Sequence, residues 1–298
     1  MIDTKQKTTL LLLSPAIIVL VMVILGPLIF SLYSSFTPFK LTRPDSINQF
    51  IGFRNYVRIF GDEDFWAAFV RTIVVLTIAL NLEMLLGLGL ALLVNRATMA
   101  QKTLRTIMMF PMMFSPILVG FQFRFMFNDN IGVVNNALQS LGITQEAIPW
   151  LVDKYLAIFS ICVAEIWNST SVFAILILAG LMSLPKDPLE AAEVDGCTKW
   201  QTFRHVTLPY LMPFLYIAMT IRSLDIARAY DIVQIMTGGG PAQRTELLWT
   251  MIARTGYVDA KMGMANAMSY VAILLSIFFT VFFFRKLNQA RHQLGVGL

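Results

Sequence analysis

Long apolar segments alternate with short polar ones along most of the chain. The apolar segments fall at about residues 10–36, 67–94, 104–127, 155–182, 208–236 and 262–284. An α-helix needs about 20 apolar residues to cross the hydrocarbon core of a bilayer, and each segment is long enough. The runs are continuous and far longer than the roughly 10 residues of a membrane β-strand. The pattern therefore predicts an all-α membrane protein with about six transmembrane helices.

Charged residues mark the ends of these segments. No charge occurs between Lys7 and Lys40, which bracket the first one. Between its flanking basic residues, the second segment carries only Glu83 and the fourth only Glu165. The fifth segment is the least uniform, because four charges interrupt it. We expect the whole chain, residues 1–298, to form a single transmembrane domain.

Composition agrees with this pattern. The chain is 57% hydrophobic and 14% charged, whereas a soluble domain is about 25% charged. The mean hydropathy of +0.68 indicates that lipid is the main solvent. The net charge is +5, and the basic residues do not form the long clusters of a nucleic-acid-binding surface. No nucleic-acid partner is therefore expected. Cys162 falls in an apolar segment and Cys197 in a polar one, so a disulfide framework is not expected.

Basic residues indicate the orientation of the chain. An N-terminus inside the cell assigns eleven basic residues to the inner segments and eight to the outer ones. Because cytoplasmic loops carry an excess of Lys and Arg, the pattern predicts that both termini are cytoplasmic. The first apolar stretch is too long for a cleavable signal peptide and should remain as the first span.

The polar segment 184–209, between the fourth and fifth spans, has the pattern of two short helices. Asp187 is a good N-cap, Pro188 suits the first helical position and Glu190 falls at the third. This first helix should run to about Asp195. Gly196 then suits the left-handed residue that ends a helix. The segment therefore predicts a helix–glycine–helix loop on the cytoplasmic side.

The second helix of this loop has its own signals. Thr198 and Gln201 have the spacing of a capping box. Trp200 and Phe203 should share one face. Pro209 is expected to end this helix and to open the fifth span.

The run Glu190-Ala191-Ala192, followed by Asp195 and Gly196, carries a family resemblance. It resembles the EAA loop of ABC-importer permeases, with matching spacing from residue 184 to 213. In that family the loop contains the coupling helix, which sits in a cleft of the ATP-hydrolysing subunit. The resemblance implies that these five residues couple the chain to a partner ATPase. Cys197 is a mild departure, because a smaller residue usually follows the glycine.

Three further stretches are similar to the carbohydrate-uptake branch of this family, the maltose and glycerol-3-phosphate type. They are residues 127–135, 178–181 and the Thr-Gly-Gly-Gly-Pro sequence at 237–241. The resemblance implies a permease of the bacterial cytoplasmic (inner) membrane for a sugar or sugar derivative. It also implies a second homologous permease, an ATPase dimer and an extracytoplasmic solute-binding protein as partners. The last stretch is typical of the first permease of such a pair.

The sequence contains no phosphate-binding P-loop, because Gly238 to Gly240 are followed by proline. We therefore expect this chain not to be an enzyme and to bind no cofactor, with ATP and Mg²⁺ held by the partner ATPase. No metal site is expected around His205 or His292.

Charges inside a span are costly and indicate functional sites. In the fifth span Arg222, Asp225, Arg228 and Asp231 alternate in sign every three residues. These charges either line a water-filled cavity that binds sugar hydroxyls or form a self-neutralising ladder. Arg124 is expected to mark the outer end of the third span and to snorkel.

Polar groups of the fourth span extend this hypothesis. Glu165 and Asn168 lie one turn apart, and Trp167 and Tyr230 are nearby aromatic residues that suit a sugar face. Helix–helix hydrogen bonds are an equally good explanation of each polar residue alone. The predicted substrate pathway consists of Glu165, Asn168, Arg222, Asp225, Arg228 and Tyr230.

Two other classes of protein remain open. An ATP-independent secondary transporter or channel would also use charges in its spans, although no inverted repeat is evident. An intramembrane enzyme would need a metal or nucleophile constellation, which two histidines outside the spans do not provide. Four arginines and four acids in the spans balance, so the sequence does not separate a neutral sugar from an acidic one. Whether this chain or its partner permease holds the substrate site also stays open.

Overall fold

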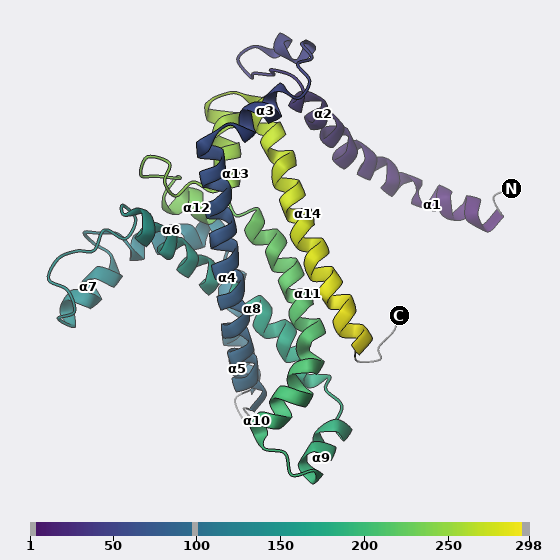
Figure 1. Ribbon diagram of the computed structural model, residues 1–298, viewed down its shortest axis with the longest axis vertical. Helices are drawn as coiled ribbons and strands as arrows, with labels where there is room; N and C mark the ends of the chain where they lie inside the picture. Colours follow the sequence, from purple (N-terminus) through teal and green to yellow (C-terminus); the bar gives the residue numbers. More distant parts are fainter. Residues whose placement is uncertain (1–3, 97–100, 294–298) are drawn as a thin grey trace. The chain divides into compact units, whose positions relative to one another are not determined.

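A computed structural model describes residues 4–96 and 101–293 (Figure 1). These residues form α-helices, short 3₁₀ and π turns and connecting loops, and they contain no β-strand. The prediction of an all-α fold is therefore confirmed. The chain divides into two compact units. One comprises the described residues up to Trp66 together with Met251–Ala272, and the other comprises those of Ala67–Thr250 and those from Ile273 onward.

The first unit contains one long helical stretch that begins near the N-terminus. It consists of α1 (Thr4–Leu20), a π-helical turn (Val21–Leu25) and α2 (Gly26–Ser35). The short helix α3 (Arg54–Phe60) follows after a loop with a 3₁₀ turn at Pro44–Asn48. The buried Asn55 side chain donates hydrogen bonds to the carbonyl oxygens of Ser35 and Thr37. These bonds fix the chain where it leaves α2.

The first unit also includes the start of the last helix, α14 (Met262–Gln293). The hydroxyl of Tyr270 lies 2.9 Å from that of Ser31, and Asn266 donates a hydrogen bond to Ser34. The amide of Gly263 donates to the carbonyl of Phe39 at 2.9 Å. Polar contacts of this kind hold helices together in lipid, where apolar burial gives little driving force.

The second unit is a bundle of helices that contributes most of the chain. Its first helix is α4 (Glu63–Arg96), whose first residues belong to the first unit. It continues through α5 (Gln101–Met109), a 3₁₀ turn (Pro111–Met113), α6 (Pro116–Met126), α7 (Val133–Ser140) and α8 (Lys154–Met182). After the 184–209 loop come α11 (Leu208–Ala227), α12 (Asp231–Met236) and the start of α13 (Leu248–Ala253). The rest of α13 and the π turn that follows it (Arg254–Val258) belong to the first unit.

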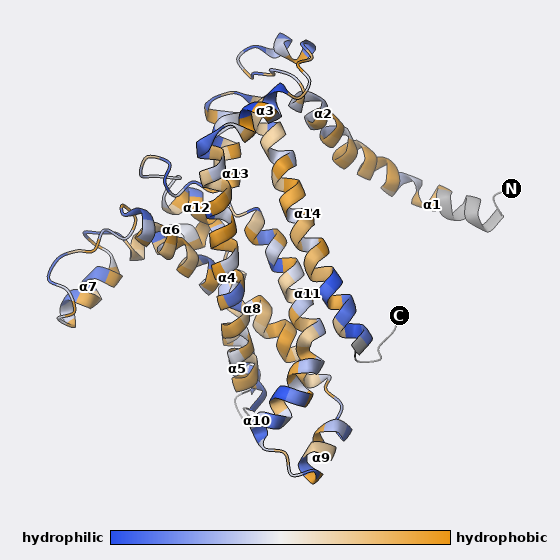
Figure 2. Ribbon diagram, in the orientation of Figure 1, coloured by the Kyte–Doolittle hydropathy of each residue, from blue (hydrophilic) through white to orange (hydrophobic). Residues whose placement is uncertain are grey.

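Four helical stretches among the described residues are long and apolar enough to cross a membrane. They are Leu11–Ser35, Glu63–Arg96, Lys154–Met182 and Met262–His292. They coincide with the predicted first, second, fourth and sixth spans. Figure 2 shows apolar residues along most of α4, α8 and α14, whereas hydrophilic residues gather in α10 and at the C-terminal end of α14.

The third predicted span, 104–127, is not one continuous helix. The chain breaks between α5 and α6 because Pro111 and Pro116 lack the amide donors that a continuous helix needs. Phe114 and Ser115 adopt extended backbone, with ψ angles of 138° and 147°. The hydroxyl of Ser115 then caps α6 by accepting the amide of Leu118.

The fifth predicted span, 208–236, is also broken. Helix α11 ends at Ala227, and α12 begins at Asp231 after a short turn at 228–230. Helix α12 packs closely against α6 because Gly120 has no side chain. A Cβ at that position would lie 2.9 Å from the Cβ of Ile235. The break therefore lets a short helix lie against α6 instead of extending α11.

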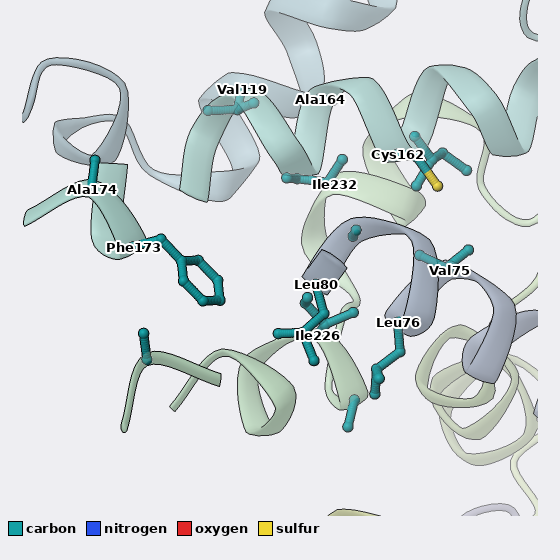
Figure 3. Close-up of a cluster of buried hydrophobic side chains, with 14 of the residues drawn as sticks. Val75, Leu76, Leu80, Val119, Cys162, Ala164, Phe173, Ala174, Ile226 and Ile232 are labelled. Atoms are coloured by element: carbon teal, nitrogen blue, oxygen red, sulfur yellow. The ribbon is translucent and has the colours of Figure 1, made fainter. Parts of the chain in front are cut away.

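One apolar core joins the helices of the second unit (Figure 3). Leu76 and Leu80 of α4, Phe173 of α8 and Ile226 of α11 are all buried in it. Helices α4 and α8 cross at short distance because a Cβ at Gly87 would lie 2.5 Å from the Cβ of Phe173. Small residues at such crossings are typical of membrane helix bundles.

Candidate functional site

The loop after α8 folds largely as its sequence predicts. Its first helix, α9 (Asp187–Val194), places Glu190 and Ala191 at the surface and buries Ala192. The prediction that Asp187 is the N-cap is wrong by one residue, because Lys186 occupies that position and no side chain caps the helix. The carbonyl of Lys186 accepts the amides of residues 189 and 190 instead. Asp187 and Glu190 both lie in the first turn, where the helix dipole favours negative charge.

Gly196 ends α9 in the predicted left-handed conformation, with φ at +76°. The amide of Cys197 donates to the carbonyl of Ala192, and the amide of Gly196 donates to that of Glu193. These two bonds form a Schellman motif that closes the C-terminus of the helix after Asp195. The helix–glycine part of the predicted loop is therefore confirmed.

The second helix of the loop starts as predicted and continues further. Thr198 and Gln201 form a complete capping box at the start of α10 (Lys199–Thr202). The rings of Trp200 and Phe203 stack with centroids 5.7 Å apart, which confirms their shared face. Trp200 is 67% exposed.

Pro209 does not end this helix, contrary to the prediction. A π-helical segment (Phe203–Thr207) connects α10 directly to α11, and the amide of Leu208 donates to the carbonyl of Phe203. The wider π turn fits a proline that follows it, because the proline ring would collide with the carbonyl four residues earlier in a regular helix. A single helical path therefore runs from Lys199 to Ala227.

A cluster of charged side chains lies where α4, α8 and α11 meet. The Arg222 guanidinium donates two hydrogen bonds to Glu83 of α4, from Nε to Oε2 at 2.9 Å and from Nη2 to Oε1 at 3.0 Å. It also donates to Oε1 of Glu165 at 3.0 Å and to Asp225 at 3.4 Å. The Arg222 side chain is 6% exposed and that of Glu83 is fully buried. This pairing satisfies charges that would be costly alone in a bilayer.

Sequence reasoning named Glu83 as a polar residue of its span but missed its role. The signal was present, since Glu83 is the one acid between Arg71 and Arg96 in a long apolar helix. Its partner lies 139 residues away in the chain. Only the packing of α4 against α11 shows which arginine neutralises it.

The predicted charge ladder along the fifth span occurs only in part. Asp225 contacts Arg228 at 3.3 Å as well as Arg222. Arg228 also donates to the carbonyl of Leu224 at 3.2 Å. Asp231 lies beyond the break in the helix, and in the described ranges 4–96 and 101–293 it has no ion pair. The ladder is therefore not self-neutralising.

A cavity of about 590 Å³ opens beside this cluster. All six residues of the predicted substrate pathway line it. The lining also includes residues that the prediction left out of the pathway, of which the polar and aromatic ones are Ser169, Asp231 and Trp249. Trp167 does not line it, because its ring packs against Phe114 and Phe123 at centroid distances of 6.1 and 5.6 Å.

Two buried polar atoms at this cavity have no hydrogen-bond partner among the described residues. They are Oδ1 of Asn168 and Nε1 of Trp249. Buried polar atoms are nearly always paired with protein, water or ligand. Both atoms are almost inaccessible, so neither faces the open cavity. The cavity itself is lined mainly by charged and polar side chains and is therefore suited to a polar ligand.

Two other arginines of the predicted spans lie away from this cavity. Arg71 donates to the carbonyls of Glu246 and Gln243, at 2.8 and 3.3 Å. Arg124 donates to the carbonyl of Ile235 at 3.1 Å, near the C-terminus of α12. The guanidinium of Arg124 thus caps a neighbouring helix, and the prediction that it marks the outer end of its span and snorkels stays a prediction.

These features define an integral membrane protein with a charged cavity among its helices and a helix–glycine–helix loop, which is the architecture of a solute permease. Over residues 83–291 the chain matches the family described as the inner membrane component of binding-protein-dependent transport systems, and it belongs to that family.

Named relatives include sugar permeases. The chain is 35% identical to the sulfoquinovosyl glycerol transport system permease protein SmoG of Agrobacterium fabrum, over 92% of this chain and 88% of the relative. It is 32% identical to the trehalose/maltose transport system permease protein MalF of Thermococcus litoralis, over 79% of each chain. It is 30% identical to the trehalose permease SugA of Mycobacterium tuberculosis strain H37Rv, over 79% of this chain and 74% of the relative.

Solved structures share the fold. The chain superposes on a subunit of a bacterial ABC transporter for the acidic polysaccharide alginate with a TM-score of 0.82 and 23% identity, covering 96% of each chain. A second structure holds that type of transporter with a periplasmic protein bound to an alginate pentasaccharide. It gives a TM-score of 0.77 and 24% identity, covering 97% of this chain and 94% of the other.

Proposed function

We propose that this chain is a permease subunit of an ATP-binding-cassette importer that moves a sugar or sugar derivative across the bacterial cytoplasmic membrane. The observation that carries the proposal is the cavity, which gathers all six predicted pathway residues from α8, α11 and the turn after α11. The relatives named as sugar permeases support the substrate class.

In this proposal α9 is the coupling helix. Its exposed Glu190 and Ala191 contact a partner ATPase, which binds ATP and Mg²⁺ and supplies the energy. The Schellman motif after α9 and the capping box of α10 make the loop rigid. The helical path from Lys199 onward then carries a displacement of the loop towards Arg222, about 20 Å along α11 from Leu208.

The proposed assembly contains a second homologous permease, two ATPase subunits and an extracytoplasmic binding protein that delivers the sugar. Both termini and the 184–209 loop lie in the cytoplasm. Arg285, Lys286 and Arg291, near the end of α14, agree with that orientation, because cytoplasmic flanks are rich in basic residues.

Co-purification tests this assembly. The tagged chain is expressed with its neighbouring genes, extracted in mild detergent and analysed for bound subunits. We expect a second permease and an ATPase to co-purify, with ATP hydrolysis stimulated by the binding protein and one sugar. A chain that purifies without any ATPase under these conditions would contradict the proposal and favour an ATP-independent transporter, which would use the same charged cavity.

A further inference from the structure

The charges around the 590 Å³ cavity do not balance. Arg222 and Arg228 are the two cations of the cluster, and no lysine or further arginine among the described residues lines the cavity. Three carboxylates line the cavity with them, namely Glu165, Asp225 and Asp231, while the fully buried Glu83 pairs with Arg222 outside the lining. Among the ionisable groups of the lining, the acids exceed the arginines by one.

Arginines elsewhere in the bundle do not restore the balance. Arg71 and Arg124 make the charges of the spans equal when the sequence alone is counted. Both arginines donate hydrogen bonds to backbone carbonyls, and neither lines the cavity. The cavity therefore has a net negative charge although the spans together do not.

Both arginines of the cavity are already paired with carboxylates. Arg222 is 6% exposed and donates to three carboxylates. Arg228, whose side chain is 60% exposed, shares its charge with Asp225 and donates Nε to the carbonyl of Leu224. Asp231, by contrast, lines the cavity with its carboxylate free of any ion pair within the described part of the chain. Oxygen acceptors thus predominate where a ligand would bind.

We infer that this cavity binds an uncharged, hydroxyl-rich sugar and rejects sugars that carry a carboxylate, sulfonate or phosphate. Hydroxyl groups donate to Asp231 and to the second oxygen of Glu165. Tyr230, 37% exposed, offers a ring face beside them. An anionic sugar meets the carboxylate of Asp231, which no cation among the described residues compensates, and is repelled by it.

This inference rests on the proposed function and narrows its substrate class. The named relatives do not decide it, because they include transporters named for neutral sugars and for an anionic one. Asp231 is the specificity-determining residue, since its charge is not committed to a protein partner.

The test measures sugar binding to the assembled transporter in detergent, without the binding protein, by saturation-transfer difference NMR. The probes are matched pairs, trehalose with its monophosphate and maltose with its monophosphate. We expect at least one neutral member to bind, with an affinity at least about tenfold higher than that of its phosphorylated counterpart. The variant Asp231→Asn should reduce this ratio several-fold. Glu146→Gln, which removes an exposed carboxylate outside the cavity, should leave the ratio unchanged.

Three results would overturn the inference. They are phosphorylated sugars that bind as well as neutral ones, an unchanged ratio in Asp231→Asn, and the absence of binding by every neutral sugar. Each is distinguishable from failure of the importer assignment. In that case no ATPase co-purifies, whatever the transporter binds.

Discussion

Arg222 is the residue on which the centre of the bundle depends. Its guanidinium forms a bidentate pair with the fully buried Glu83 and reaches Glu165 and Asp225 with its remaining donors. The attraction within a buried ion pair mainly offsets the cost of removing both groups from water. The cluster therefore contributes more to the choice of helix partners than to net stability. The removal of one member leaves another charge buried without a partner, and the full cost of its desolvation is then no longer offset.

Replacement of Arg222 by methionine should destabilise the protein strongly. It leaves Glu83 buried without a cation, which costs about 3–5 kcal/mol. Thermal unfolding in detergent, followed by size-exclusion fluorescence, measures the loss. Arg228→Met is the control, because its side chain is 60% exposed and its ion pair should contribute less than about 1 kcal/mol. The double variant Arg222→Met with Glu83→Leu should recover part of the loss, and no recovery would contradict this explanation.

Glu190 allows a test of coupling at the residue scale. Its carboxylate is exposed in the first turn of α9, so replacement by arginine should not disturb the packing of this chain. We expect Glu190→Arg to abolish sugar uptake while membrane insertion stays normal, because the exchanged charge prevents docking on the ATPase. Glu146→Arg, an equal charge change on an exposed loop, should transport normally. Normal uptake by Glu190→Arg would refute the coupling role of α9.

At the scale of elements, close approach of helices depends on single glycines. Helix α4 carries two glycines near its C-terminal end, and only one of them lies at a crossing. A Cβ at Gly87 would meet Phe173 of α8 at 2.5 Å, whereas nothing lies within 4 Å of a Cβ at Gly89. The two positions have the same helical backbone and differ in their surroundings.

This difference gives a matched pair of substitutions. Gly87→Ala should lower stability by about 1–3 kcal/mol, because α4 and α8 must separate to admit the methyl group. Gly89→Ala should be neutral, or stabilising by up to about 1 kcal/mol, through its better helix propensity. Melting temperatures of the two variants, purified side by side, provide the measurement. Equal effects at the two positions would show that the α4–α8 crossing is looser than its geometry indicates.

At the scale of the whole molecule, the native cysteines report the proposed topology. Cys197 is exposed in the 184–209 loop, and Cys162 is buried in α8. A membrane-impermeant maleimide should label the chain in inside-out vesicles and not in right-side-out ones. Cys197→Ser should abolish the labelling, since Cys162 is inaccessible. Labelling of right-side-out vesicles would place the loop outside the cell and reverse the orientation.

Much of the fold could be predicted from the sequence because its signals are local. Apolar length identified four of the long helical stretches, and Gly196, Thr198 and Gln201 specified how the loop folds. The breaks in the two other predicted spans were missed. Pro111 and Pro116 were visible, but apolar length outweighed them in the interpretation, and the turn after α11 has no proline to mark it.

The candidate site was predictable in its members but not in its pairing. Charges in apolar segments identified Glu165, Arg222 and Asp225, because lipid tolerates few of them. The pairing of Arg222 with Glu83, and the engagement of Arg71 by distant carbonyls, depend on which helices touch. Periodicity and composition contain no information about such contacts, so the excess of negative charge emerged only from the three-dimensional arrangement.

The separation of Glu83 and Arg222 along the chain has a consequence in time. Ribosomes add about 5–20 residues per second, so Arg222, 139 residues later, is made roughly seven to twenty-eight seconds after Glu83. During that interval the newly synthesised α4 carries the Glu83 carboxylate without the Arg222 guanidinium, at an insertion cost of about 3 kcal/mol. The insertion of α11 supplies Arg222 and so allows the ion pair to form. The bundle is therefore complete only after α11 has been inserted, and a chain stalled before residue 222 would leave Glu83 without its ion-pair partner.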